Sequence, residues 1–260
     1  MGFHAARLHE SHLIVPAWPA PANIKALITT RNGGVSTGAY ASLNLGMQVG
    51  DEAAAVEENR RRLSVMLPRA PMWLQQVHGT QVACADDPAH IVVSTTATAD
   101  AVRTTAIDQP CAVMLAACLP VLFCDDAGTE VAAAHAGWRG LCAGVLENTV
   151  AAMSAKPASL MAYLGPAIGP AQFEVGSEVR DAFIAVDESA AAAFTPRVTA
   201  GKFVANIYLL ARQRLARAGV LRVYGGDYCT VGDAARFFSY RRDGNTGRMA
   251  ALIWRGESVS

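Results

Sequence analysis

Short apolar runs alternate along the chain with longer segments in which apolar residues recur every three or four positions. A short apolar run between turn residues is typical of a buried strand, whereas a period of 3.6 is typical of a helix packed on one face. The runs predict strands over residues 24–30, 81–85, 91–94, 113–115, 121–124, 131–135, 160–164, 222–224 and 249–254. The periodic segments predict helices over residues 51–67, 141–155, 177–186 and 206–218.

Residues that commonly cap or stop helices mark three of these segments. Asn206 can cap the helix that follows it, and Gly219 lies where that helix should stop. Ser177 is placed to cap the helix over residues 177–186, and Pro68 ends the helix over residues 51–67. We therefore expect these helices to end at or near these positions.

Strands and helices alternate through the middle of the chain, and no repeat, low-complexity tract or linker divides it. This arrangement is typical of α/β or α+β proteins with mixed sheets. We expect one domain over residues 1–260. The pattern leaves the order of the strands open.

Composition limits the class of partner. Lysine plus arginine and aspartate plus glutamate each total 22, so no net field draws the chain onto nucleic acid or anionic lipid. The longest apolar run, residues 111–124, is shorter than the ~20 residues that span a bilayer. The first residues lack the apolar core of a signal peptide. We expect a cytoplasmic protein that binds no nucleic acid or membrane.

The six cysteines form no C-x-x-C pair, and several lie in or near apolar runs. A disulfide framework is not expected in such a chain, and most of these thiols should behave as small buried hydrophobes. At least one remains a candidate metal ligand or nucleophile.

Three segments combine a reactive side chain with glycine or proline at an expected strand end. They contain His78, Cys118 and His135. Two imidazoles and one thiolate can hold zinc and leave the fourth tetrahedral position for water, so these residues are candidate metal ligands and catalytic residues. The spacings of 40 and 17 residues match no local zinc motif. Taken singly, Cys118 also fits a core thiol and each histidine a hydrogen-bonded structural residue.

Longer motifs carry a resemblance. The stretches TTRNGGVSTGAYASLNLG, QQVHGTQV, CLPVLFCD, AAHAGWRG, YLGPAIGPAQFEVG and FFSYRRDGNTGRMA resemble the YfiH-type family, in this order along nearly the whole chain. Its members have been called polyphenol oxidoreductases, laccase-domain proteins and purine nucleoside phosphorylases. The resemblance implies a four-layer α/β/β/α fold with mixed sheets, and zinc bound by His78, Cys118 and His135.

One position departs from the family pattern. The family has aspartate immediately before the cysteine, whereas this chain has Ala117. A carboxylate beside a zinc-bound thiolate could orient a ligand, bind substrate or shuttle a proton, and alanine can do none of these. The departure predicts intact metal ligands with weakened catalysis.

Other polar residues in the family-like motifs are weaker candidates. Arginine suits bidentate contact with phosphate, and an asparagine or glutamine can contact ribose or a base edge, although surface or ion-pair roles are equally open. The candidate substrate contacts are Arg31, Asn44, Gln76, Arg139, Arg241 and Arg242. Asp100 and Asp125 fit turn or cap residues better than a catalytic base. His4, His9 and His12 fit a solvated terminus, and Trp138 fits a packing residue.

The resemblance implies phosphorolysis of adenosine, inosine, guanosine and methylthioadenosine, with adenosine deamination in the same site. The alternative it supports is a hydrolase that edits UDP-MurNAc precursors carrying L-serine. The partners would then be a nucleoside and phosphate, or that precursor; the oligomeric state is open.

Two further alternatives concern the metal. A copper laccase needs many histidines, typically in His-x-His pairs, and this chain has six histidines and no such pair. Copper could still bind the three ligands adventitiously. A non-enzymatic zinc-stabilised protein would need a fourth protein ligand, for which Cys124 and Cys229 are available.

Overall fold

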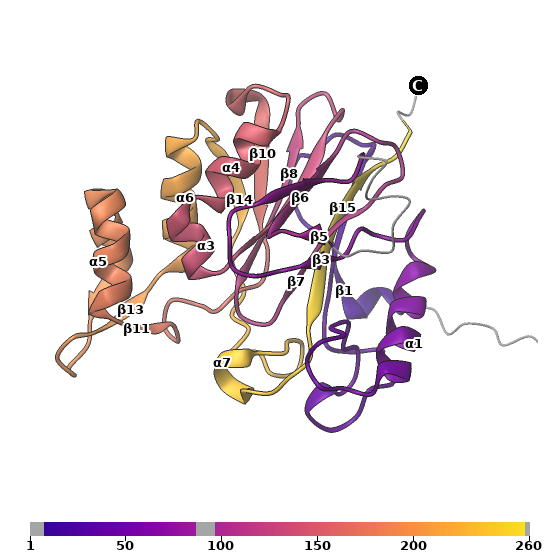
Figure 1. Ribbon diagram of the computed structural model, residues 1–260, viewed down its shortest axis with the longest axis horizontal. Coiled ribbons are helices and arrows are strands. Elements are labelled where there is room, and N and C mark those ends of the chain that lie inside the picture. The colour runs from indigo at the N-terminus through magenta and orange to yellow at the C-terminus, as the bar shows by residue number, and fades with distance from the viewer. Residues whose placement is uncertain (1–7, 87–96, 258–260) are drawn as a thin grey trace, which may run out of the picture.

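The computed structural model describes residues 8–86 and 97–257, and its centre is a six-stranded mixed sheet (Figure 1). The strand order is β14-β10-β8-β9-β6-β4. The outer pairs β14–β10 and β4–β6 are parallel, and the inner pairs are antiparallel. The strands are β4 (Val82–Cys84), β6 (Ala101–Thr104), β8 (Leu119–Asp125), β9 (Val131–Ala136), β10 (Leu160–Leu164) and β14 (Arg222–Gly225).

A second sheet, of order β1-β2-β15-β7, is antiparallel throughout. Its strands are β1 (Leu13–Ile14), β2 (Ile24–Thr29), β7 (Cys111–Leu115) and β15 (Met249–Arg255). Two small sheets complete the strands. One pairs β3 (Leu74–Gln75) with β5 (Ala97–Thr98), and the other consists of β11 (Glu174–Gly176), β12 (Phe194–Pro196) and β13 (Lys202–Ala205).

Helices cover the outer faces of the two sheets, which gives the four layers α/β/β/α (Figure 1). On one side lie α3 (Trp138–Ala143), α4 (Val145–Ala152), α5 (Ser177–Val186) and α6 (Ile207–Arg217), and on the other lies α1 (Ala53–Ser64). The short helix α7 is Tyr240–Asp243, and the 3-10 turns are η1 (Glu10–His12), η2 (Gly38–Tyr40), η3 (Pro157–Ser159) and η4 (Glu188–Ala193). In the described residues no helix is long and apolar enough to cross a membrane.

Alternation along the strands explains the layering. In β8, Leu119, Val121 and Phe123 pack against the helices, whereas Leu122 and Cys124 pack between the sheets. Successive side chains of a strand point to opposite faces, so a strand covered on both sides is apolar at every position. This accounts for the continuous apolar runs in the sequence.

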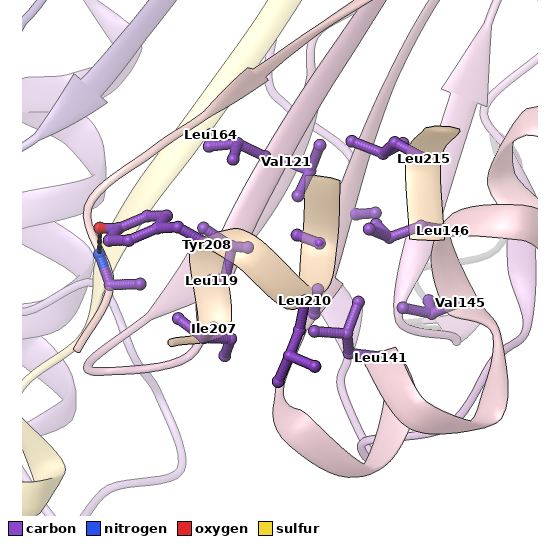
Figure 2. Close-up of a cluster of buried hydrophobic side chains, with 14 of the residues drawn as sticks. Leu119, Val121, Leu141, Val145, Leu146, Leu164, Ile207, Tyr208, Leu210 and Leu215 are labelled. Carbon is purple, nitrogen blue, oxygen red and sulfur yellow. Dashed lines mark hydrogen bonds between the residues drawn. The ribbon is translucent and has the colours of Figure 1, made fainter. Parts of the chain in front are cut away.

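The core between the six-stranded sheet and its helices is filled by aliphatic side chains (Figure 2). Leu146 of α4 and Leu210 of α6 lie in this cluster and are buried. The Tyr208 hydroxyl in this cluster is satisfied, because it accepts a hydrogen bond from the Ala167 N–H at 2.8 Å and donates to the Tyr228 carbonyl at 2.8 Å. The helical layer is thereby fixed to the loop after β10.

The predicted strands within the described residues form with ends within two residues of expectation. The strand predicted over residues 91–94 lies outside the described residues. The helix over 206–218 is confirmed with its cap, since Asn206 accepts a hydrogen bond from the Leu209 N–H. Seven short strands were not predicted, because two to four residues give too little periodicity; they are β1, β3, β5, β6, β11, β12 and β13.

Three helix predictions are corrected. The helix over 141–155 begins earlier, at Trp138, and is divided into α3 and α4 at Gly144, whose φ of +104° ends the first helix. Ser177 is the first residue of α5, and Gly176 occupies the cap position instead. The helix over 51–67 is α1, which ends at Ser64, before Pro68 is reached.

Candidate metal centre

Strand register brings two of the three predicted ligands together. His135 is the penultimate residue of β9, between β8 and β6. Leu119 pairs with Ala136, so Cys118 lies at the same end of the sheet as His135. Val131 and Ala133 of β9 pack between the sheets, and alternation places His135 on that same face.

The third ligand comes from a loop. His78 follows β3 and adopts a left-handed backbone, with φ of +61°. The N–H groups of Val77, His78 and Gly79 all donate to the carboxylate of Asp100, at 3.1, 3.0 and 2.6 Å. Asp100 also bonds His135 Nδ1 at 2.9 Å. The loop is therefore fixed relative to β9 through one side chain.

The three ligand atoms lie within 4.8 Å of one another, and the group is the one cluster of three metal-ligating side chains in the described chain. His78 Nε2 is 3.7 Å from Cys118 Sγ. Tetrahedral zinc with bonds of ~2.1 Å to nitrogen and ~2.3 Å to sulfur separates two such ligands by ~3.6 Å. The donor set and this spacing fit zinc, and copper accepts the same donors.

Glycine at position 137 leaves the room that the cluster needs. A Cβ there would lie 2.7 Å from His78 Cδ2 and 3.0 Å from Cys118 Sγ. Both distances are shorter than ordinary van der Waals contacts. The glycine after His135 is thus required by close approach of its neighbours.

Charge in the cluster is balanced between a thiolate and an imidazolium. Burial alone would raise the pKa of Cys118, but the charge and hydrogen bond of His135 and the hydrogen bond with His78 lower that pKa to about 6. Burial would lower the pKa of His135, but the Cys118 thiolate and the Asp100 hydrogen bond raise it to about 9. The two shifts act in the same sense, and both favour a Cys118 thiolate beside a His135 imidazolium in the metal-free protein.

A cavity of about 520 Å³ opens next to the cluster and is lined by its three members. This volume is in the range of small-molecule sites. Of the predicted substrate contacts, Gln76 and Arg139 lie on its wall. The lining residues that the sequence did not single out include Arg60, Trp73, Tyr240 and Arg248.

Arg31, Asn44 and Arg241 are not among the lining residues. Arg31 Nε donates to the Ala41 carbonyl and its guanidinium lies 4.6 Å from the Phe238 ring centre. Arg241 donates to the Glu174 carbonyl. Asn44 is fully buried and accepts hydrogen bonds from the backbone of Gly46 and Arg248, both of which line the cavity. Asn44 therefore fixes the backbone of two lining residues without lining the cavity itself.

Other candidates lie elsewhere. Arg242 donates to three backbone carbonyls near α7, and Trp138 stacks under the Arg139 guanidinium. Cys124 is buried between the sheets, and Cys229 Sγ accepts from Gly169 and Gly232, so neither joins the cluster. His9 bonds Ser11. His12 is also outside the cluster, and His4 lies outside the described residues.

The two aspartates expected at turns differ. Asp125 accepts hydrogen bonds from Thr129 and Glu130 in the turn after β8, as predicted. Asp100 instead connects both histidines, a role that no local motif signals because its partners lie 21 to 35 residues away.

Comparison with known proteins identifies the family. The family described as multi-copper polyphenol oxidoreductase laccase matches residues 25–256. The chain belongs to this family. It is 55% identical over 246 residues to purine nucleoside phosphorylase YfiH of Escherichia coli, which covers 94% of this chain and 99% of that protein. It is 54% identical over 241 residues to purine nucleoside phosphorylase PA4543 of Pseudomonas aeruginosa, covering 93% and 97%.

A solved member of this YfiH-type family has the same fold. Protein NMB0706 of Neisseria meningitidis superposes with a TM-score of 0.89 at 55% identity, covering 95% of this chain and all of that chain. The description of this family refers to several coppers. In the described residues, however, one three-ligand cluster is present and not the several sites that such an oxidase needs.

We expect Gly137→Ala to weaken zinc binding by roughly tenfold or more, because the new Cβ would displace His78 or Cys118, and disturbed ligand shells lose affinity on that scale. Competition with a chromophoric chelator measures this. The matched control is Gly232→Ala, whose Cβ would meet nothing closer than 3.7 Å. Equal affinity of the Gly137→Ala variant and the parent would contradict this account of the cluster.

In chelator-treated protein, we expect iodoacetamide to alkylate Cys118 with a rate that rises with pH and is half-maximal at about pH 6, because the thiolate is the nucleophile and its pKa is lowered to about 6. Peptide mass spectrometry separates Cys118 from Cys124, whose pKa burial raises to about 12. Zinc should protect Cys118. A midpoint at the ordinary thiol pKa would be inconsistent with the thiolate–imidazolium pair.

Proposed function

We propose that this chain is a zinc-dependent purine nucleoside phosphorylase that also deaminates adenosine, with catalysis weakened at Ala117. The observation that carries the proposal is the cavity of about 520 Å³ into which His78, Cys118 and His135 all face. Two relatives at 54% and 55% identity bear the name purine nucleoside phosphorylase. We further propose Zn²⁺ as the resident metal, with copper as an adventitious occupant.

The wall of the cavity suits phosphate. Arg60, Arg139 and Arg248 line it, and no aspartate or glutamate is among its described lining residues. Arg60 is fixed by its bond to the Leu45 carbonyl and by stacking 4.3 Å from the Trp73 ring centre. Arg248 is fixed by the Thr246 carbonyl. Each guanidinium has five N–H donors, so donors remain for phosphate oxygens.

The other substrate, a purine nucleoside, needs an aromatic surface and polar contacts. Tyr240 lines the cavity with 64% of its surface exposed, so its ring is available to stack on a base. Gln76 binds Met114 through both ends of its amide, which fixes its orientation on the wall. Its second amide N–H remains available to a base edge.

The reaction assigns distinct tasks to these residues. Zinc, when bound, supplies Lewis-acid chemistry that polarises oxygen and lowers the pKa of water. The arginines hold phosphate beside the sugar, and they stabilise the negative charge of the phosphate as the base departs. Asp100 holds the His135 ring through Nδ1. At position 117 the side chain lines the cavity beside Cys118 but offers no proton acceptor.

Two alternatives remain, a UDP-MurNAc hydrolase and a non-enzymatic zinc protein. The UDP-MurNAc hydrolase would use the same three ligands, and no contact in the cavity favours it over a nucleoside. The non-enzymatic alternative needs a fourth protein ligand, and neither Cys124 nor Cys229 is part of the described cluster. Three ligands facing a cavity favour an enzyme.

We expect zinc-loaded Ala117→Asp to convert adenosine and phosphate to adenine and ribose-1-phosphate roughly 100-fold or more faster than the parent, because a placed general acid or base contributes on that scale. Chromatography of products, including inosine, measures both activities. His78→Ala in the Ala117→Asp background should abolish both activities.

No product from any purine nucleoside with either chain, while zinc stays bound, would reject the phosphorylase. Release of product from UDP-MurNAc-L-serine in the same assay would support the alternative hydrolase. Oxidation of a phenol only after copper loading would mark oxidase activity as adventitious.

We expect Arg248→Met to raise the KM for phosphate by roughly tenfold or more and to leave the KM for adenosine nearly unchanged, because a hydrogen bond between charged groups is worth ~1.5–3 kcal/mol. Initial rates in the Ala117→Asp background measure both constants. Arg236→Met is the control, since Arg236 pairs with Asp233 and does not line the cavity. An unchanged phosphate KM would exclude Arg248 from the anion site.

A further inference from the structure

We propose that Asp100 is the positioning residue that sets the metal affinity of this site, by fixing both histidines with one carboxylate. The inference rests on the proposed metal site at His78, Cys118 and His135. Asp100 is fully buried immediately before β6, and its two oxygens receive hydrogen bonds from both histidine segments. Asp100 itself does not line the cavity.

The first effect is on the His135 ring. Ala101 pairs with Ala134, so Asp100 lies opposite His135, and the His135 N–H also donates to the Asp100 carbonyl at 2.7 Å. The carboxylate oxygen Oδ1 is 2.9 Å from Nδ1. This bond holds the proton on Nδ1, which directs Nε2 toward the metal and raises its basicity.

The second effect is on the backbone that carries His78. The N–H groups of Val77, His78 and Gly79 point at the same carboxylate, which is an anion-binding nest whose anion is a side chain. A left-handed φ at a non-glycine residue costs free energy, and His78 has a φ of +61°. Without the carboxylate, three N–H groups would lose their acceptor and the strained turn would lose its support.

A second aspartate provides a matched control. Asp125 is 4% exposed and also accepts two backbone N–H groups, from Thr129 and Glu130, together with the Thr129 hydroxyl. It lies at the other end of β8 from Cys118 and contacts no member of the cluster. Loss of charge at Asp125 therefore tests what a buried turn carboxylate contributes without a metal.

The experiment compares Asp100→Asn with Asp125→Asn. Asparagine keeps the shape, but one end of its amide would present N–H groups either to His78 and His135 or to Val77 and Gly79. We expect Asp100→Asn to lower zinc affinity by roughly 10–100-fold, the effect typical of lost outer-shell partners, and Asp125→Asn to stay within about twofold of the parent. Chelator competition measures affinity, and thermal unfolding of the metal-free proteins measures the shared loss of stability.

A spectroscopic readout separates positioning from stability. The d–d absorption of the Co²⁺-loaded protein reports ligand geometry, and we expect it to change in Asp100→Asn but not in Asp125→Asn. Equal zinc affinities of Asp100→Asn and the parent, or equal losses in the two variants, would overturn the proposal. These measurements use metal alone. They therefore test the role of Asp100 even if the protein shows no activity on nucleosides.

The parent protein gives a test that does not depend on a variant folding. In zinc-loaded protein labelled with ¹⁵N-histidine, we expect His135 to carry its proton on Nδ1 and none on Nε2. A proton on Nε2, or metal bound through Nδ1, would overturn the assigned role of Asp100. Failure of the parent to bind zinc would overturn it as well.

Discussion

The site depends on the register of β9, which is hydrogen-bonded to β8 on one edge and to β6 on the other and is buried on both faces. That pairing aligns His135 with Asp100 on one neighbour and brings Cys118 to the same end of the other. Because side chains alternate, a slip of one residue would turn His135 into the helical layer. Ala132, Ala134 and Ala136 fill that other face, where they pack in the core beneath the helices.

Local backbone preferences are violated where the cluster is built. His78 and Ala117 both have positive φ, at +61° and +133°, and neither is glycine. Such conformations cost ~1–3 kcal/mol each and persist only where surrounding contacts determine them. For His78 those contacts are the bonds to Asp100, and for Ala117 one of them is the bond from the Ile168 N–H to its carbonyl. The rest of the fold supplies the free energy that keeps these turns in place.

The cavity carries a local excess of positive charge, although the chain as a whole has none. The formal net charge of the whole chain is zero, yet three arginines line the cavity and no acid does so among the described residues. Arg60 comes from α1 and Arg248 from the segment before β15, which are far apart in sequence. Each donates a hydrogen bond to a backbone carbonyl, which fixes the position of its guanidinium group. This local excess of positive charge supports the proposed phosphate site.

The sequence alone determined the longer strands such as β8 and β9, because a strand buried on both faces is a continuous apolar run. It also determined the three ligand candidates, because their motifs carry the family resemblance. It placed Asn206 correctly, since capping is a local interaction. Tertiary structure decided what local patterns cannot encode. The break at Gly144, the supporting rather than lining role of Asn44, and the lining roles of Arg60, Tyr240 and Arg248 depend on partners distant in sequence. Asp100 is the clearest case: as a sequence it is a turn residue before a strand, and only antiparallel pairing and a folded-back loop make its buried carboxylate the acceptor for both histidine segments.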